Sequence, residues 1–188
     1  MSRILVQSQD NSKSLGVIEL EHKRIHEGNG FNANKQLLDG ETLETGDKLY
    51  ICVSVGNFPI HLKTRRVQFD KSKVRVKIFE DADFDDENAD EIPAYAMNRT
   101  NVKDAAMKLY NAELAPELEE ATLIGENVLQ GLEEGAGNRL VGSPAADDNT
   151  LEYIYKPNSK YVLELENIDA TTIEFMNVYW FWYVSGRS

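Results

Sequence analysis

The chain has few of the residues that would tie it to an oxidising compartment or a membrane. Cys52 is its only cysteine, so no intrachain disulfide can form and no oxidising compartment is implied. No apolar run approaches the ~20 residues of a membrane helix. The N-terminal residues 1–16 contain no apolar segment long enough for a signal peptide. We therefore expect a protein that is made in a cytoplasm and does not bind membranes.

Basic residues are also in deficit. The 20 Lys and Arg residues stand against 32 Asp and Glu residues, which gives a formal net charge of -12. A nucleic-acid backbone favours Lys and Arg, so we expect no direct nucleic-acid binding. A hydrophobic fraction of 41% excludes a disordered chain, and 188 residues suffice for one domain with a sizeable core.

No arrangement of nucleophile and base stands out. The chain has no G-x-S-x-G elbow and no Gly-rich phosphate loop. Carboxylates are numerous, but nothing selects one pair for glycoside hydrolysis. Cys52 lies in an apolar run with no histidine nearby in sequence, which indicates a small core or interface residue. We therefore expect no enzymatic activity and no cofactor.

Two clusters resemble metal sites. His22 and His26 are four residues apart, which on a helix could hold zinc. Residues 17–26 are predicted to form a strand, however, and there the two side chains would lie about 13 Å apart. No metal site is therefore expected at this histidine pair.

The acidic run 81–91 begins like a calcium loop, with Asp81, Asp83 and Asp85. Such a loop requires Gly at its sixth position and Glu at its twelfth. Those positions hold Asp86 and Ile92, so an EF-hand is excluded. The two alternatives that remain are a solvated acidic loop, which we favour, and a looser surface cation site.

Short runs with period-2 alternation predict antiparallel strands over most of the chain. In 73–78, Val and Ile alternate with Lys and Arg, and we expect the basic face to be solvated, although pairing with acidic neighbours remains open. Residues 101–114 have apolar residues at helical spacing, but a strand over 106–112 fits as well. Roughly eight strands with long connections favour an all-β, antiparallel two-sheet β-sandwich, in particular a jelly roll.

The N-terminal residues 1–16 are expected to be a flexible arm attached to a sandwich domain over 17–188. The arm is rich in Ser, Gln and Asn, and its only compact apolar patch is Ile4, Leu5 and Val6. We expect this patch to anchor the arm to a neighbouring subunit.

The last predicted strand is aromatic on both faces, since it contains Tyr179, Trp180, Phe181, Trp182 and Tyr183 in succession. A strand with one solvated face should alternate apolar and polar residues. We therefore expect something to cover its second face. The alternatives are sandwich core, a sugar-stacking platform on Trp180 or Trp182, or a subunit interface, where aromatic residues are enriched.

Four segments resemble a family of small virion proteins of tailed bacteriophages. Residues 22–28 with Phe31 resemble the opening motif H-x-x-I-H-x-G-x-x-F, and 98–100 resemble a central Asn-Arg-Asn element. Residues 153–163 resemble the block E-x-I-L-K-x-N-T-x-Y-L-x-R-x-T-N, and 182–183 match a terminal W-Y. The four segments occur in the order of the family. The chain departs from the pattern at Thr100, Glu166 and Val184 and in its highly charged 81–91 run.

The resemblance implies a non-enzymatic β-sandwich that decorates and stabilises the phage capsid by binding the major capsid protein. It places the protein on the outer surface of the virion and favours a strand over 106–112. Because closed symmetry buries an apolar patch without forming filaments, we expect a homo-oligomer, with a trimer favoured. A tail or adaptor virion protein and a carbohydrate-binding module are the alternatives.

Overall fold

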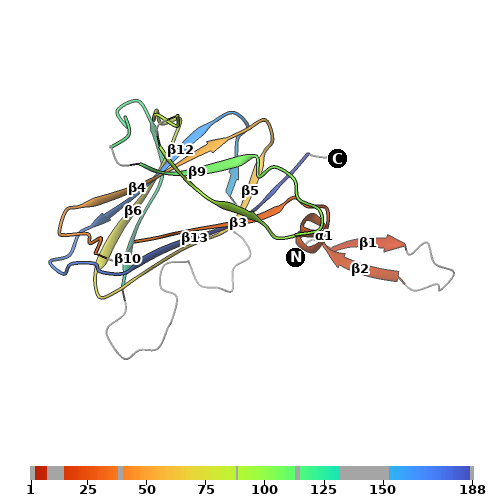
Figure 1. Ribbon diagram of the computed structural model, residues 1–188, viewed down its shortest axis with the longest axis horizontal. Coiled ribbons are helices and arrows are strands. Elements are labelled where there is room, and N and C mark those ends of the chain that lie inside the picture. Colours follow the sequence, from red (N-terminus) through yellow and green to blue (C-terminus); the bar gives the residue numbers. More distant parts are fainter. Residues whose placement is uncertain are drawn as a thin grey trace.

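The computed structural model describes residues 3–7, 15–37, 40–87, 89–112, 115–131 and 153–186. Within these ranges nearly all ordered elements are strands, and most of them form two antiparallel sheets that pack face to face (Figure 1). The prediction of an all-β two-sheet sandwich is therefore confirmed. No helix in these ranges is long and apolar enough to cross a membrane.

The six-stranded sheet has the order β10-β6-β12-β4-β9-β7. Its strands are, in that order, Thr122–Gln130, Lys73–Glu80, Lys160–Asn167, Lys48–Val55, Met107–Ala112 and Asp90–Ile92. The five-stranded sheet has the order β11-β5-β13-β3-β8. Its strands are Tyr153–Tyr155, Ile60–Phe69, Met176–Val184, Gly30–Gln36 and Ala94–Ala96.

Eight of these strands follow the wrapping order of a jelly roll. The antiparallel neighbours β3–β13, β4–β12, β5–β11 and β6–β10 are the four pairs of one long hairpin rolled over on itself. Successive pairs alternate between the two sheets. Strands β7, β8 and β9 are inserted between β6 and β10, and they widen both sheets next to β3 and β4.

Aromatic side chains fill the core between the sheets. Trp180 and Trp182 of β13 are 1% and 0% exposed, and the Trp182 ring lies 6.0 Å from that of Phe31. Tyr155 of one sheet stacks on Tyr161 of the other with ring centroids 4.1 Å apart. Full burial of a large apolar side chain is worth roughly 1.5–3 kcal/mol, so these residues are a main source of stability.

A smaller apolar cluster lies on the outer face of the six-stranded sheet, where the acidic run and the segment 115–121 cover it. Its buried members are Cys52, Ala82, Phe84, Tyr110 and Val162. The expectation that Cys52 is a core residue is therefore confirmed. Burial raises the pKa of its thiol to about 12, so the thiol stays protonated at neutral pH.

The prediction of a strand over 17–26 is wrong beyond Glu19. Strand β2 (Leu15–Glu19) leads directly into helix α1 (Leu20–His26). The helix ends in a Schellman motif, in which Asn29 N donates to Arg24 O at 2.9 Å and Gly28 N donates to Ile25 O at 3.0 Å. Gly28 has a φ of 76°, the left-handed conformation this motif requires. Gly28 is therefore a helix stop.

The ambiguity over residues 101–114 is settled in favour of the strand, because β9 spans Met107–Ala112 and no helix forms among the described residues of that segment. Strand β6 also follows the predicted alternation, with Val74, Val76 and Ile78 buried.

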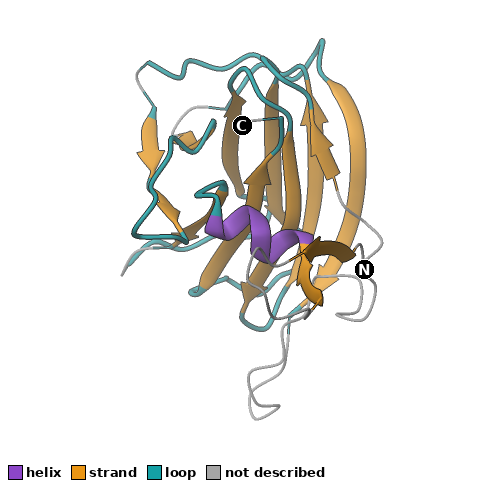
Figure 2. Ribbon diagram, turned by 90° about the vertical axis from the view of Figure 1, so that its right-hand side faces the viewer, coloured by secondary structure: helices purple, strands orange, loops and turns teal. Residues whose placement is uncertain are grey.

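The described part of the N-terminal arm is a hairpin rather than an extended chain. Strand β1 (Arg3–Gln7) pairs with β2 in a two-stranded sheet, and the expected boundary at residue 16 falls inside β2. The hairpin projects from the body beside α1 (Figure 1). Figure 2, which looks at that end, shows α1 in front of the strands. Residues 1–2 and 8–14 of the arm lie outside the described residues.

Candidate functional site

The first two of the four resembling motifs meet at the α1 end of the sandwich. Asn98 Nδ2 donates to His26 O at 2.9 Å, which ties the 98–100 segment to the end of the helix. Asn98 Oδ1 accepts from Thr100 N at 3.0 Å and from Thr100 Oγ1 at 2.7 Å. A Cβ on Gly28 would lie 2.2 Å from Asn101 O, so only glycine fits here. Thr100 departs from the family pattern, but its two hydrogen bonds to Asn98 stabilise this end of the sandwich.

The other two motifs contribute to the core and its rim. Trp182 Nε1 donates to Ala105 O at 3.3 Å, and the Tyr183 ring stacks on His61 at 4.7 Å. Tyr161 Oη donates to Glu80 Oε1 at 2.8 Å and accepts from Lys156 N at 3.0 Å. Burial raises the pKa of Tyr161, so its hydroxyl remains a donor. Most of these motif residues thus make contacts that stabilise the fold.

The histidine pair lies on α1 and not on a strand, so the spacing argument against a metal was wrong. The rings of His22 and His26 stack with centroids 4.8 Å apart, and both side chains are exposed. Within the described ranges, no group of three His, Cys, Asp or Glu side chains could hold a metal ion. Two exposed imidazoles alone do not make a metal centre of ordinary coordination number.

An ammonium group lies among the acidic side chains of the 81–91 run. Lys160 Nζ is 2.8 Å from Phe84 O, 3.3 Å from Asp86 Oδ1 and 3.8 Å from Asp83 Oδ1. The same atom lies 4.6 Å from the centroid of the Phe84 ring. The Lys160 ammonium therefore supplies the positive charge that a bound surface cation would otherwise bring to this acidic run.

The outer face of the six-stranded sheet carries a ladder of ion pairs. Lys48 Nζ lies 3.0 Å and Lys77 Nζ 3.5 Å from the Glu164 carboxylate, whose side chain is only 3% exposed. Arg75 pairs with Glu166 at 3.0 Å. The hydrogen bond to Glu164 raises the pKa of Lys48. The expectation that the basic face of β6 is solvated is therefore wrong, because acidic residues of β12 neutralise it.

The five aromatic residues of the strand that was expected to form an interface lie in two different environments. Trp180, Trp182 and Tyr183 are at most 4% exposed, so neither tryptophan can be a platform for sugars. Tyr179 and Phe181 lie on the face opposite to the two tryptophans and are half-buried on the outer face of the five-stranded sheet. The structure therefore leaves two of the five aromatic residues for a contact with another molecule.

The other three interface candidates, Ile4, Leu5 and Val6, lie in β1, where their backbones pair with Ile18, Val17 and Gly16. This pairing places them in the projecting hairpin, away from the aromatic strand (Figure 1). The structure therefore does not bring the two groups of candidates together.

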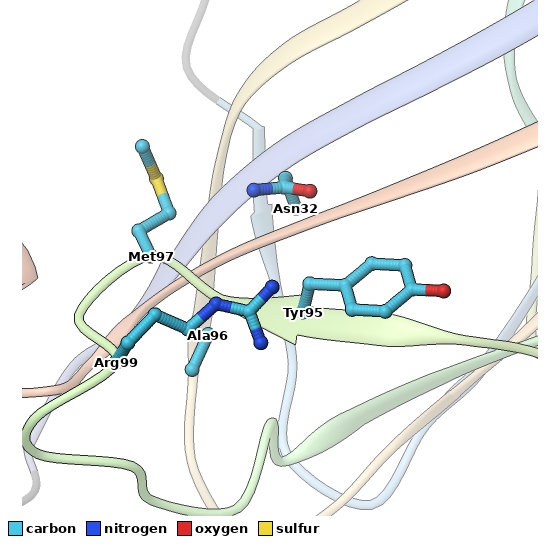
Figure 3. A pocket seen from close by; sticks show the side chains of 5 residues that line it. All are labelled: Asn32, Tyr95, Ala96, Met97 and Arg99. Atoms are coloured by element: carbon cyan, nitrogen blue, oxygen red, sulfur yellow. The ribbon is translucent and has the colours of Figure 1, made fainter.

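Cross-strand rows place polar side chains around Tyr179 and Phe181. Tyr179 lies between Asn34 and Arg66, Phe181 between Asn32 and Thr64, and Asn177 between Gln36 and Gln68. At the edge formed by β8, an open hollow of about 390 Å³ is lined by Asn32, Tyr95, Ala96, Met97 and Arg99 (Figure 3). The sequence analysis missed this amide-rich surface, because it depends on which strands are neighbours.

Comparison of the chain with protein-family models, with curated proteins and with solved structures found no match. The function is therefore argued from the motifs and from the geometry above.

Proposed function

We propose that this protein is a structural component of a tailed-bacteriophage virion that decorates and stabilises the capsid by binding the major capsid protein. The observation that carries the proposal is the order of four family-like motifs along the chain. It is supported by their placement, because two of them interlock through Asn98 and His26 and the others pack in and around the core. Residues far apart in sequence thus serve one structural purpose, as expected of a fold shared with that family.

The character of the surfaces also supports a role in assembly. The only thiol is buried and protonated, which makes it unsuitable as a nucleophile. The hollow beside β8 is open and is lined by five residues, unlike the enclosed clefts in which small substrates usually bind. A folded body with a broad sheet face and a projecting hairpin is instead suited to contacts between subunits.

The proposal is tested on purified virions of the phage that encodes the chain. Quantitative mass spectrometry should find hundreds of copies per particle, whereas a tail or adaptor protein would be present in about a dozen. Particles that lack the protein should open at lower temperature or under milder osmotic shock than complete particles. Particles that assemble and survive like wild type would show that the protein does not stabilise the capsid.

We also propose a trimer, because a closed three-fold arrangement matches the abundant three-fold sites of an icosahedral lattice. Analytical ultracentrifugation of the free protein should show a complex of three chains. A monomer at high micromolar concentration would exclude a trimer that forms before capsid binding.

A further inference from the structure

We infer that the outer face of the five-stranded sheet is the surface through which this protein docks on an acidic protein surface. This inference rests on the proposed function, under which that acidic surface belongs to the major capsid protein. The docking face is defined here by Asn32, Asn34, Arg66, Tyr179 and Phe181 and, at the β8 edge, by Arg99.

Charge is segregated between the two sheets. The five strands β3, β5, β8, β11 and β13 contain no Asp or Glu, although the whole chain has a formal net charge of -12. Of their basic side chains, Arg66 lies opposite Tyr179 on the outer face, whereas Lys35 and Arg65 lie opposite the inward-facing Val178 and Trp180. In the six-stranded sheet, by contrast, basic and acidic residues are interleaved and paired, as Arg75 is with Glu166 and with Glu126. The lack of carboxylates is therefore a property of one sheet and not of the chain.

The six-stranded sheet is also the less available of the two. Phe84 and Tyr110 pack in the apolar cluster on its outer face, with their rings 6.1 Å apart and tilted by 54°. Lys160 further secures the covering loop through Phe84 O and Asp86. On the five-stranded sheet, the outward side chains of Asn34 and Arg66 remain exposed beside half-buried Tyr179. Exposed polar groups around a half-buried aromatic centre resemble the core and rim of a protein interface.

Two arginines on the docking face are placed to bind carboxylates. Arg66 and Arg99 are both exposed, and within the described ranges neither forms an ion pair with a carboxylate. The Arg99 guanidinium lies 5.8 Å from the centroid of the Tyr95 ring, and it reaches into the hollow near Asn32 (Figure 3). A guanidinium and an amide that converge on one hollow offer several donors to an acidic side chain. Arg99 is thus the member of the 98–100 motif that lines the hollow.

An acidic protein fits this face better than a nucleic acid does. A phosphate backbone presents charge at close, regular intervals and requires many Lys and Arg contacts. The docking face has only two outward arginines, separated by the amides and aromatic rings of β3 and β13. Amides and half-buried aromatic rings satisfy polar and apolar groups of a protein surface, while a few cations set its orientation.

The experiment uses capsids stripped of the protein and the purified full-length chain. The double variant Arg66→Glu/Arg99→Glu should bind these capsids about tenfold or more weakly than wild type. Binding of wild type should weaken as salt rises, and the variant should lose most of that salt dependence. The control is Lys73→Glu/Lys108→Glu, which reverses two exposed charges on the six-stranded sheet, one of them paired with Glu91 at 3.1 Å, and should bind like wild type. A thermal melt of each variant checks folding.

A third variant, Tyr179→Ser, tests the half-buried centre of the face without changing charge. It should weaken capsid binding as well, while the melting midpoint stays close to that of wild type because Tyr179 lies outside the core. The inference is overturned if wild type binds stripped capsids and Arg66→Glu/Arg99→Glu binds them just as tightly. In that case the proposed function stands and another surface docks.

If wild type itself does not bind stripped capsids, both the proposed function and this inference fail. If the arginine variant leaves capsid binding intact but turns a free oligomer into monomers, the face joins copies of this chain. That result also overturns the inference.

Discussion

The hydroxyl group of Tyr161 lies between the Glu80 carboxylate and the backbone N–H of Lys156, near the turn between β11 and β12. Tyr161 Oη donates to Glu80 Oε1 at 2.8 Å, and Lys156 Nζ lies 2.9 Å from Glu80 Oε2. The hydrogen bonds from Lys156 and then from Tyr161 lower the pKa of Glu80 from its ordinary 4.5. Both are residues of the 153–163 block that resembles the phage family. The buried hydroxyl of Tyr161 thus connects the core to the ion pair of Glu80 and Lys156 at the surface.

This arrangement predicts how stability depends on pH. Because the folded pKa of Glu80 lies below its unfolded value, the stabilisation is present above about pH 4.5 and is lost as pH falls through the folded pKa. Glu80→Gln should therefore be less stable than wild type at pH 7, and this difference should shrink toward pH 3. Urea denaturation at several pH values measures it. A difference that stays constant over this range would show that the charge of Glu80 does not contribute.

The residue scale also shows what the sequence could indicate about the candidate site. Strict alternation predicts that Tyr179, Phe181 and Tyr183 share one face and that Trp180 and Trp182 share the other. It does not say which face is inside, because both are aromatic. A β-bulge opposite Phe181 and Trp182 adds Lys63 to β5, and this residue lies 5.9 Å from the ring of Tyr183. Tyr183 is thereby 4% exposed, a local outcome that no periodicity could predict.

At the scale of elements, success depended on whether apolar and polar residues alternate along a segment. Strand β6 was predicted correctly because its buried aliphatic residues alternate with Lys and Arg. The 101–114 segment was ambiguous because its apolar residues fit the periodicity of a helix and that of a strand. In the structure, β9 pairs with β4 and β7, and this long-range pairing stabilises the strand. Helix α1 was missed because it has only seven residues and directly follows a strand without a break. Gly28 was the signal that could have marked its end.

The end of α1 provides the second prediction. Gly28→Ala should destabilise the protein by about 2 kcal/mol or more, since a left-handed φ is strained for alanine and the new Cβ would meet Asn101 O at 2.2 Å. Gly46→Ala is the matched control, because its φ is 87° but no atom lies within 4 Å of a Cβ there. The difference between the two free energies of unfolding isolates the clash with Asn101. Equal losses would mean that the helix end moves freely away from the 98–101 segment.

At the scale of the whole molecule, the sequence indicated a sandwich but not its surfaces. Predicted strands together with their turns suffice for the fold class, since so many short strands pack most readily as two sheets. The charge pattern of the docking face was present in the sequence, because none of its five strands contains a carboxylate. It could not be recognised there, because these strands are scattered from β3 to β13 and become neighbours only through the jelly-roll order.

At the same scale, the projecting hairpin either supports the sandwich or serves the proposed attachment to a capsid. Strands β1 and β2 form a separate two-stranded sheet with no ladder to either sheet of the body. Helix α1, by contrast, contacts β3 and β13, and its end is fixed by Asn98. The hairpin can therefore be removed without breaking a ladder of the jelly roll. Its backbone ordering costs about 1 kcal/mol or more per residue, which a contact with a neighbour would offset.

Deletion of residues 2–16, which removes β1 and the start of β2, separates these roles. The shortened protein should keep the thermal midpoint of the full chain, because the jelly-roll pairs β3–β13 and β4–β12 are untouched. Its occupancy on stripped capsids should fall when protein is limiting and recover when protein is in excess, as expected for the loss of one of two contacts. A marked fall in the thermal midpoint would show that the hairpin supports the fold. Unchanged occupancy at limiting protein would leave the docking face as the sole attachment, since the hairpin would then add nothing to binding.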